Sequence, residues 1–543
     1  MKTDPETFDF IIVGAGTAGC ALAYRLAEAG NSVCVFEAGP PDSNPLIRIP
    51  SGIMKTSSNP NLTWRYEFEG SKNTKNRRIP AFFGKTLGGS SAINGMVYNR
   101  GQRSDFDGWA AGGAEGWDYF SVLPYFRKSE NYLDNGEDQF RGRHGPVPVA
   151  KLKMREQIAD RFIKSAQATG IPLTDDYNGR EQEGVSYVQA QILNGRRWSS
   201  AHAYLHPARR KFGVDVRTKA LVRRILIKDG RATGVEYGAW NSDELRTVVA
   251  RKSTIVSAGA LISPKLLQLS GIGSAKLLRE MGIAVVRDLP GVGENMTDHY
   301  SLRMVARIKG GYGTINERAR GLPLVAEIAK WLVGQPSVLA MTAMAIFTFC
   351  KSDKSSPETD YSLMFLPASL KAGMTRQLDN FPGVSGGAWQ MRPESRGYVR
   401  IKSLDMREAP IIQPNYLDAE IDRQVAVRAI KHLDRVFKTD PLASLIEEIT
   451  LPAGGCSTDD EWLDYVRGNG MSSYHPAGTC TMGSLSNPMA VVDSRLRVIG
   501  VRDLRVVDAS IMPTQPSGQL NAGVMMIAEK AADMILEDYQ ASV

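Results

Sequence analysis

The clearest pattern of apolar and polar positions stands at the start of the chain. Residues 8–13 are a largely apolar run, glycines follow at once, and apolar residues then recur at helical spacing up to residue 29. A second apolar run, 33–36, ends in the acid Glu37. This pattern predicts a buried strand, a tight turn, an amphipathic helix and a second strand.

Later segments carry weaker patterns of the same two kinds. Helical spacing predicts helices over 117–130, broken by Pro124, over 156–169, from 263 and over 422–437. Strands are predicted at 185–192, 221–227, 232–237, 253–257 and 397–401, and the run 253–257 is expected to join the first strand's sheet. A final helix is expected to fold back onto the first domain, because apolar residues share one of its faces: Val524, Ile527, Ala528, Ala531 and Ile535.

The glycines of the first turn predict a dinucleotide site. Gly14 permits the tight turn, Gly16 lets the backbone approach a pyrophosphate, and Gly19 lets the helix pack closely on the sheet. Glu37 can accept hydrogen bonds from ribose hydroxyls and would repel a 2′-phosphate, which argues against NADP. The motif alone does not separate FAD from NAD.

Bulk composition narrows the class of protein. A chain of 543 residues exceeds one compact core, so two or more domains are expected, and a change of composition at 302–470 indicates a second one. The net charge is 66 − 58 = +8, but basic pairs are scattered, which argues against nucleic-acid binding. Five widely spaced cysteines and no apolar run of about 20 residues lead us to expect a cytoplasmic protein without a membrane span.

Three further segments resemble the glucose–methanol–choline (GMC) oxidoreductase family. They are 84–101 (GKTLGGSSAINGMVYNRG), 259–273 (GALISPKLLQLSGIG) and the pair 475–483 (HPAGTCTMG) and 507–513 (VDASIMP). The resemblance implies an α/β fold (α+β overall) with a discontinuous Rossmann-like FAD-binding domain and a substrate domain containing an antiparallel sheet and helices. The ranges expected are 1–158, 190–310 and 472–543 for the first, and 159–189 and 311–471 for the second.

The resemblance also implies a set of cofactor-binding residues. Some members tether FAD through a histidine in the 84–101 loop, but Ile93 stands there, so the FAD is expected to be noncovalent. The expected contacts are Gly14, Gly16, Thr17, Ala18, Gly19, Glu37, Ala38, Gly88, Gly89, Ser90, Asn94, Gly95, Val97, Val222, Ala258, Asp508, Ala509 and Asn521.

A single histidine carries the expected chemistry. The chain has six histidines, and none belongs to an H-E-x-x-H motif, so no metal site is expected. The resemblance makes His475 the base that removes the hydroxyl proton of an alcohol, while FAD accepts the hydride at N5.

The second catalytic position departs from the family pattern. Where the family has asparagine or histidine, the alignment places Gln519, which keeps the carboxamide but is one methylene longer. Gln519 is expected to steady the substrate oxygen, and Asn521 to face the flavin from the first turn of the last helix. Helix capping is the alternative explanation for both residues.

The substrate expected from the sequence is a primary alcohol, aryl or aliphatic, with oxygen or an electron carrier as the acceptor. Methionine and phenylalanine gather between 339 and 366, which suits either an apolar pocket or an ordinary core: Met341, Met344, Phe347, Phe349, Met364 and Phe365. Two alternatives stay open, an FAD-containing lyase or photodecarboxylase on the same scaffold, and a flavin-binding protein without catalysis.

Overall fold

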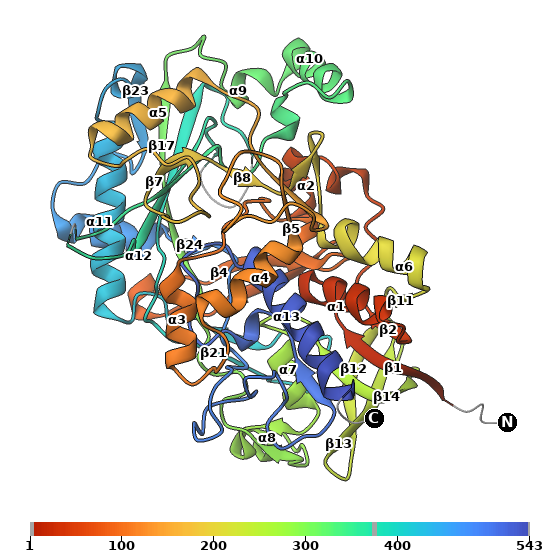
Figure 1. The fold of residues 1–543 in the computed structure, drawn as a ribbon. Helices are drawn as coiled ribbons and strands as arrows, with labels where there is room; N and C mark the ends of the chain where they lie inside the picture. The colour runs from red at the N-terminus through yellow and green to blue at the C-terminus, as the bar shows by residue number, and fades with distance from the viewer. Residues whose placement is uncertain (1–4, 354, 372–376, 541–543) are drawn as a thin grey trace.

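The first of two large sheets carries the predicted nucleotide fold. The computed structural model describes residues 5–353, 355–371 and 377–540, and Figure 1 shows their arrangement. The first sheet has the order β11-β2-β1-β14-β13-β12, with β25 beside β14. Its strands are β1 (Glu6–Val13), β2 (Val33–Phe36), β11 (Asp215–Arg217), β12 (Leu221–Lys228), β13 (Arg231–Gly238), β14 (Arg246–Val256) and β25 (Leu504–Val506). β14 pairs parallel with β1, which confirms the predicted return of 253–257 to this sheet.

Helices α1 (Thr17–Glu28) and α13 (Leu520–Gln540) pack together beside this sheet (Figure 1). Glycine is needed at the turn before α1, because Gly14 has φ +105° and a Cβ there would lie 2.4 Å from the carbonyl oxygen of Ser257. A Cβ on Gly19 would lie 1.9 Å from the carbonyl oxygen of Gly14, so this glycine permits the close packing that was predicted. The contact of α13 with α1 confirms that the last helix folds back onto the first domain.

The second sheet is antiparallel and has the order β23-β17-β20-β19-β18-β7, with β24 beside β17. Its strands are β7 (Gly184–Tyr187), β17 (Tyr300–Ile308), β18 (Ile346–Phe349), β19 (Tyr361–Leu366), β20 (Gly383–Gln390), β23 (Ile446–Leu451) and β24 (Met471–Ser472). Helices α5 (Gln157–Ala168) and α11 (Glu420–Phe437) cover one face. β17 belongs to this sheet although it lies within the range predicted for the nucleotide domain. The domain ranges themselves stay a prediction.

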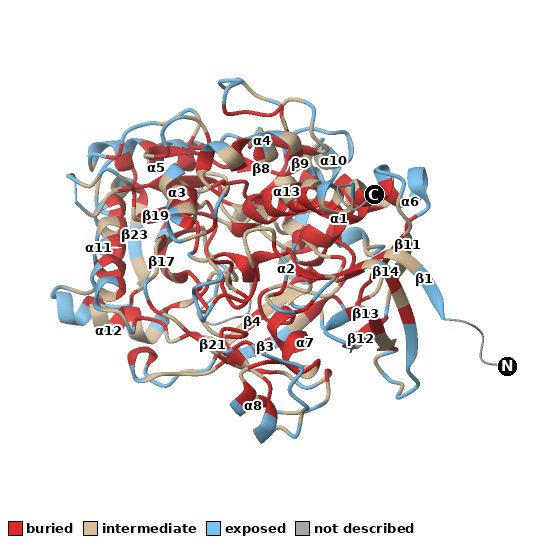
Figure 2. Ribbon diagram, turned by 60° about the horizontal axis from the view of Figure 1, so that its bottom comes forward, coloured by how far each residue is buried: buried red, intermediate tan, exposed pale blue. Residues whose placement is uncertain are grey.

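The remaining elements connect and flank the sheets, and the centre of the molecule is largely buried (Figure 2). The helices are α2 (Ile53–Thr56), α3 (Arg103–Ala111), α4 (Tyr119–Ser129), α6 (His206–Phe212), α7 (Ser263–Leu269), α8 (Ala275–Glu280), α9 (Ile315–Arg318), α10 (Gly321–Leu332) and α12 (Asp459–Asn469). The strands are β3 (Thr63–Phe68), β4 (Ile79–Gly84), β5 (Glu130–Tyr132), β6 (Val147–Lys151), β8 (Gln189–Ala190), β9 (Ile192–Leu193), β10 (Arg196–Arg197), β15 (Ile272–Gly273), β16 (Arg287–Asp288), β21 (Tyr398–Arg400) and β22 (Ile411–Gln413).

Two local predictions were wrong. Helix α4 continues through Pro124, which was expected to break it. Proline removes one backbone hydrogen bond, but Val122, Leu123 and Phe126 are buried on both sides of it, so tertiary packing holds the helix together. The run 185–192 is not one strand but falls into β7, β8 and β9, which pair in different sheets.

Candidate functional site

A cavity of about 980 Å³ lies between the two sheets. Val13 and Ser257, at the carboxyl ends of β1 and β14, line one part of it, and Arg303, Met364 and Trp389 from the antiparallel sheet line another. Ligands of open α/β sheets bind outside the carboxyl ends of the strands, as here. The volume is at the upper end of the range of ligand cavities, about 300–1,000 Å³.

Most of the predicted site residues line this one cavity. His475 and Gln519 are among them, together with Gly14, Gly16, Thr17, Ala18, Glu37, Ala38, Gly89, Ser90, Asn94, Gly95, Val97, Val222, Ala258, Asp508, Ala509 and Asn521. Gly19 and Gly88 are not among the lining residues. Gly19 lies inside α1, and Gly88 donates its backbone N–H to the carbonyl of Ala15 at 2.8 Å, so both shape the turn behind the wall.

Glu37 is buried at the nucleotide end of the cavity. Its Oε2 accepts from the N–H of Ala15 at 3.1 Å, and its Oε1 accepts from the N–H of Gly39 at 2.8 Å. Burial raises the pKa of Glu37 to about 7, against the lowering effect of these two hydrogen bonds. The carboxylate keeps further lone pairs that can accept from a ribose.

The residues present fit FAD. The N-terminus of α1 opens on the cavity at Gly16 and Thr17, where free backbone N–H groups and the helix dipole favour a phosphate. The backbone of Gly89 packs so closely that a Cβ there would lie 2.8 Å from the Cα of Gly16. Ser257 Oγ and Gln519 Oε1 are buried and have no hydrogen-bond partner among the described residues, although both residues line the cavity. Unpaired polar atoms in such a place are available to a ligand.

A buried arginine supports the 84–101 loop, and the sequence reasoning missed it. Arg197 donates from Nη1 to Asn94 Oδ1 at 2.8 Å and from Nε to the carbonyl of Ile47 at 3.0 Å. Burial lowers the pKa of this guanidinium to about 9. Ile93, at the position where some members tether FAD, lines the cavity with an alkyl side chain that cannot form such a bond.

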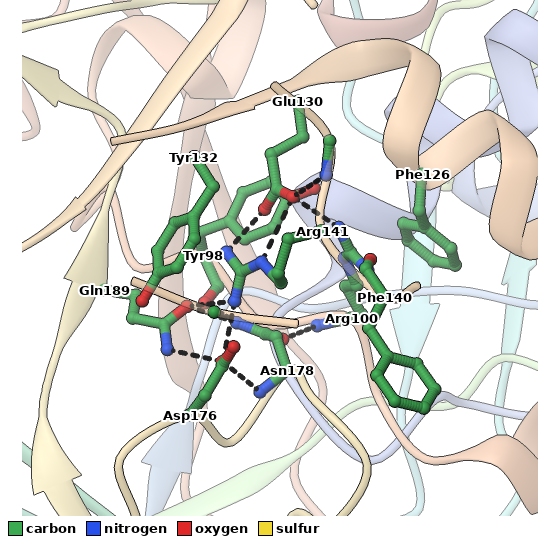
Figure 3. Close-up of polar contacts among 12 residues, drawn as sticks. Tyr98, Arg100, Phe126, Glu130, Tyr132, Phe140, Arg141, Asp176, Asn178 and Gln189 are labelled. Carbon is green, nitrogen blue, oxygen red and sulfur yellow. Dashed lines mark hydrogen bonds and ion pairs between the residues drawn. The ribbon is translucent and has the colours of Figure 1, made fainter. Parts of the chain in front are cut away.

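A second group of buried charges holds the far end of the same loop (Figure 3). Glu130 receives Arg100 Nη2 and Arg141 Nη2, both at 2.6 Å. Arg141 also donates from Nη1 to Asp176 Oδ1 at 2.7 Å and to Gln189 Oε1 at 2.8 Å. Because Arg100 is part of the loop and Gln189 begins β8, the network joins the loop to the small sheet of β5, β6 and β8. Its three main side chains have at most 1% of their surface exposed.

His475 is paired with a second histidine that the sequence reasoning did not single out. The Nδ1 atoms of His299 and His475 lie 3.1 Å apart. His299 Nε2 lies 2.8 Å from the carbonyl oxygen of Met391, which can only accept, so the proton of His299 is on Nε2. Gln515 Nε2 donates to His299 Nδ1 at 3.0 Å and to the carbonyl of His475 at 2.9 Å.

Both histidines are neutral near pH 7. Burial lowers the pKa of His299 to about 4. Burial and the neighbouring ring of His299 hold the pKa of His475 well below 6.5. A neutral His299 with its proton on Nε2 has one lone pair on Nδ1, which accepts from Gln515 Nε2 and also faces His475 Nδ1. Two facing lone pairs would repel at 3.1 Å, so we place the proton of His475 on its Nδ1, where it shares this acceptor with Gln515. The Nε2 of His475 then carries a lone pair and can act as a base.

Asp298 fixes the backbone at His475. Its Oδ1 accepts from the N–H of His475 at 2.8 Å, and its Oδ2 accepts from Ser472 Oγ at 2.5 Å and from the hydroxyl of Tyr416. Burial raises the pKa of Asp298 to about 6. The indole of Trp389 packs on the imidazole of His475 with ring centroids 5.0 Å apart.

Asn521 and Gln519 differ in how they are held. Asn521 accepts from Thr17 Oγ1 and donates to Gln191 Oε1, each at 2.7 Å, so its amide joins α13 to the start of α1. Gln519 precedes α13 and has the unpartnered Oε1 described above. Of the two amides, Gln519 therefore has the free hydrogen-bonding capacity.

The apolar segment 339–366 divides between cavity and core. Met341, Met344 and Met364 line the cavity. The three phenylalanines, Phe347, Phe349 and Phe365, are fully buried and are not among the lining residues; Phe365 stacks on Phe162 of α5. Strand alternation explains the difference at 364 and 365, since neighbouring residues of β19 point to opposite faces of the sheet.

The charges along the cavity are uneven. Among the described residues, Glu37 and Asp508 are the acids that line the cavity, and both lie near its nucleotide end. Their carboxylates accept hydrogen bonds from backbone N–H groups. The antiparallel sheet instead contributes Arg303, and the residue before α10 contributes Arg320. In the antiparallel sheet, Arg303 of β17 and Met364 of β19 both lie opposite Gly387 of β20. Two residues along β17, Ser301 lies opposite Trp389. Two residues along a strand separate Arg303 from Ser301 by about 7 Å.

One possible metal-binding group lies elsewhere. His202 and His206, four residues apart, approach Asp42 Oδ2 at 3.9 and 3.0 Å. The H-x-x-x-H spacing was not considered in the sequence reasoning. Burial, together with the charges of Arg48 and Arg210, lowers the pKa of His202 to about 4. The same positive charges would repel a cation, so we assign no metal role to this group.

Comparisons with known proteins agree with the geometry. Family models described as GMC oxidoreductase match residues 8–301 and 393–528. Oxygen-dependent choline dehydrogenases of Rhizobium johnstonii and Brucella suis are 38% identical to the chain, covering 97% of it and 95% of each relative. Among solved structures, pyridoxine 4-oxidase from Mesorbium loti is 29% identical with a TM-score of 0.86, covering 97% of this chain and 98% of the other. Formate oxidase is 26% identical with a TM-score of 0.90, covering 99% of this chain and 100% of the other.

Proposed function

The chain belongs to the GMC oxidoreductase family, and we propose that it oxidises a primary alcohol to the aldehyde with His475 as the base. The enzyme is an FAD-dependent oxidoreductase. The observation that carries the proposal is the pairing of the Nδ1 atoms of His299 and His475 at 3.1 Å, since it supports a lone pair on His475 Nε2.

In this proposal the residues of the chain handle the proton and hold the oxygen. His475 Nε2 accepts the hydroxyl proton, which makes loss of hydride from the adjoining carbon easier. The carboxamide of Gln519 hydrogen-bonds to the substrate oxygen, and Met341, Met344 and Met364 exclude water from the reacting carbon. FAD, when bound, supplies the hydride acceptor that no side chain offers. Oxygen or an electron carrier would be the final acceptor.

The charges of the cavity favour a neutral or anionic alcohol. A quaternary ammonium such as choline needs a carboxylate or an aromatic cage. Among the described residues, the substrate end of the cavity has Arg303 and Arg320 and no acid. Residues 372–376, which lie outside the described part of the chain, contain no Asp or Glu. Aromatic residues do line the cavity, among them Trp389 beside His475 and Tyr474. Our preference for aryl and aliphatic alcohols over choline therefore depends on the two arginines and on the lack of an acid among the described lining residues at this end.

The test is an anaerobic screen of alcohols that follows the flavin absorbance. Bleaching by benzyl alcohol or an aliphatic primary alcohol is expected, and His475→Ala should abolish it while the protein stays yellow. If no alcohol bleaches the flavin, a lyase or a non-catalytic flavoprotein is the better account. If the alanine variant reacts as fast as the parent, His475 is not the base. Admission of air with measurement of peroxide then identifies the acceptor.

A further inference from the structure

Helix α10 presents apolar side chains to the outside of the molecule. Leu322, Val325, Ile328 and Leu332 recur on one side of the helix, and Val333 follows its end. These five residues, here called the α10 surface, are between 40% and 85% exposed. In Figure 1 the helix stands at the edge of the molecule, away from both sheets.

The inward side of α10 has a buried acid between the partly buried Leu324 and Trp331, whereas its other large apolar residues face outward. Glu327 is the buried residue of the helix. It forms an ion pair with Arg318 at 2.8 Å and accepts from the N–H of Val338 at 2.9 Å. Ser337 Oγ donates to its carbonyl at 2.8 Å. These bonds satisfy the inward acid and hold the helix with its apolar residues outward.

Positive charge and a tryptophan border the α10 surface. Residues 318–333 contain three basic residues and one acid, a net charge of +2, although Arg318 and Lys330 both pair with Glu327. The Trp331 ring donates from Nε1 to the carbonyl of Gly195 at 2.8 Å, and the Arg196 guanidinium lies 4.9 Å from its centre. An outward apolar face beside basic residues and a tryptophan is the composition of helices that lie in the interface of anionic membranes.

We propose that the α10 surface docks the enzyme on an anionic lipid bilayer. A helix of 12 residues is about 18 Å long, and contact between two such single helices would bury far less than the roughly 1,200 Å² of a stable dimer. A bilayer interface needs only the apolar face of one helix. The helix does not cross the membrane, and no described helix is long and apolar enough to do so.

Docking there would place the cavity beside the lipid. Leu324 from this helix, Arg320 directly before it, and Ile315 from α9 line the cavity. An apolar substrate or a lipid-soluble electron acceptor would then reach the cavity from the bilayer. The docking itself does not depend on the proposed alcohol oxidation, because it concerns the outer face of α10.

Vesicle flotation of the FAD-loaded full chain tests the proposal. The vesicles are pure phosphatidylcholine, or equal parts of phosphatidylcholine and phosphatidylglycerol. We expect the protein to float with the mixed vesicles and to be released by high salt. For the double variant Leu322→Glu/Val325→Glu, the fraction of protein that floats with the mixed vesicles should fall about tenfold or more. Leu485→Glu is the matched control, since Leu485 is 75% exposed but lies outside α10, in a turn of the C-terminal part of the chain. This variant should float like the parent.

Three results would overturn the proposal. The first is a parent protein that does not float with the mixed vesicles, and the second is a double variant that floats as well as the parent. The third is a parent dimer in buffer that the double variant dissociates, with neither form floating, which would make the surface a subunit interface. Thermal unfolding and flavin absorbance of both variants would establish that they are folded.

Discussion

The Nδ1 atoms of His299 and His475 face one another at 3.1 Å, although the two residues are 176 positions apart in the chain. Neutral imidazoles so placed share one proton between these atoms. The carbonyl of Met391 fixes the proton of His299 on Nε2, so the shared proton belongs to His475. The candidate base is therefore prepared, before any substrate enters, by His299, the residue directly before β17.

Substitutions at His299 should show whether its Nδ1 acts as a hydrogen-bond acceptor or whether the side chain only fills space. In His299→Asn, the amide oxygen can replace Nδ1 as the acceptor, whereas His299→Ala offers none. We expect the alanine variant to reduce its flavin about 10- to 100-fold more slowly, the usual cost of losing the partner of a functional histidine. The asparagine variant should recover much of this rate. Equal rates in both variants, measured by anaerobic stopped flow, would contradict the assigned proton positions.

The pH dependence of flavin reduction should have a plateau that extends below pH 6.5. The pKa of His475 is well below 6.5, so its base form is already complete at pH 6.5, and the rate falls only at more acidic pH. His299 contributes to this lowering, so His299→Ala should move the acid limb to higher pH. A parent profile that still rises above pH 7 would show that another group titrates.

Substitutions at Gln519 and at Asn521 should have different effects on turnover and on FAD binding. Gln519→Leu removes the free carboxamide and should lower kcat about 100-fold, the cost of losing one donor to the reacting oxygen. Asn521→Ala removes the bonds to Thr17 and Gln191 and should loosen FAD and lower the Tm with less effect on kcat. Loss of bound FAD in Gln519→Leu, with the rate per bound flavin unchanged, would favour helix capping instead.

Arg303 should decide the preference for charged alcohols. A matched pair is 4-(hydroxymethyl)benzoate and benzyl alcohol, which differ by one carboxylate. Arg303→Met should raise the KM for the benzoate and leave that for benzyl alcohol nearly unchanged, because only the former can pair with the guanidinium. Arg400→Met is a suitable control, since Arg400 pairs with Glu294 and does not line the cavity. A parent enzyme that prefers choline to both would contradict the charge argument.

The buried charges of Figure 3 should contribute to stability rather than to chemistry. Glu130→Gln leaves Arg100 and Arg141 buried without their common carboxylate, which should cost about 3–5 kcal/mol. Glu244→Gln, in an exposed pair with Arg246, is the control and should leave the Tm unchanged. Chemical denaturation of the FAD-loaded enzymes measures both. A Glu130→Gln variant as stable as the parent would show that the network is replaceable.

Local patterns predicted a good part of the fold. The strand, turn and helix at 8–29 and the helices at 156–169 and 422–437 were correct because each depends on neighbours in the chain. Pro124 shows the limit, since the packing of α4 outweighed a local helix breaker. The 185–192 run failed for a similar reason, because partners from different sheets divide it.

The candidate site was predicted where glycine turns and family motifs carry it. Gly14, Gly16 and His475 could be named from sequence because their spacing is itself the signal. His299, Arg197 and Arg303 could not, since a histidine or arginine in an ordinary strand has no periodicity that marks its partner. Asp298 and His299 stand side by side in the sequence, which is the one local signal that could have drawn attention to them.

The sequence by itself therefore determined the dinucleotide turn and the order of the family motifs, and it singled out His475 as the candidate base. The tertiary structure decided which nitrogen of that base is free, which methionines reach the cavity, and that α10 turns its only acid inward. The physical reason is range. A turn or a helix follows from residues a few positions apart, whereas a shared proton, a cavity wall or an outward apolar face depends on chain segments that meet only after packing.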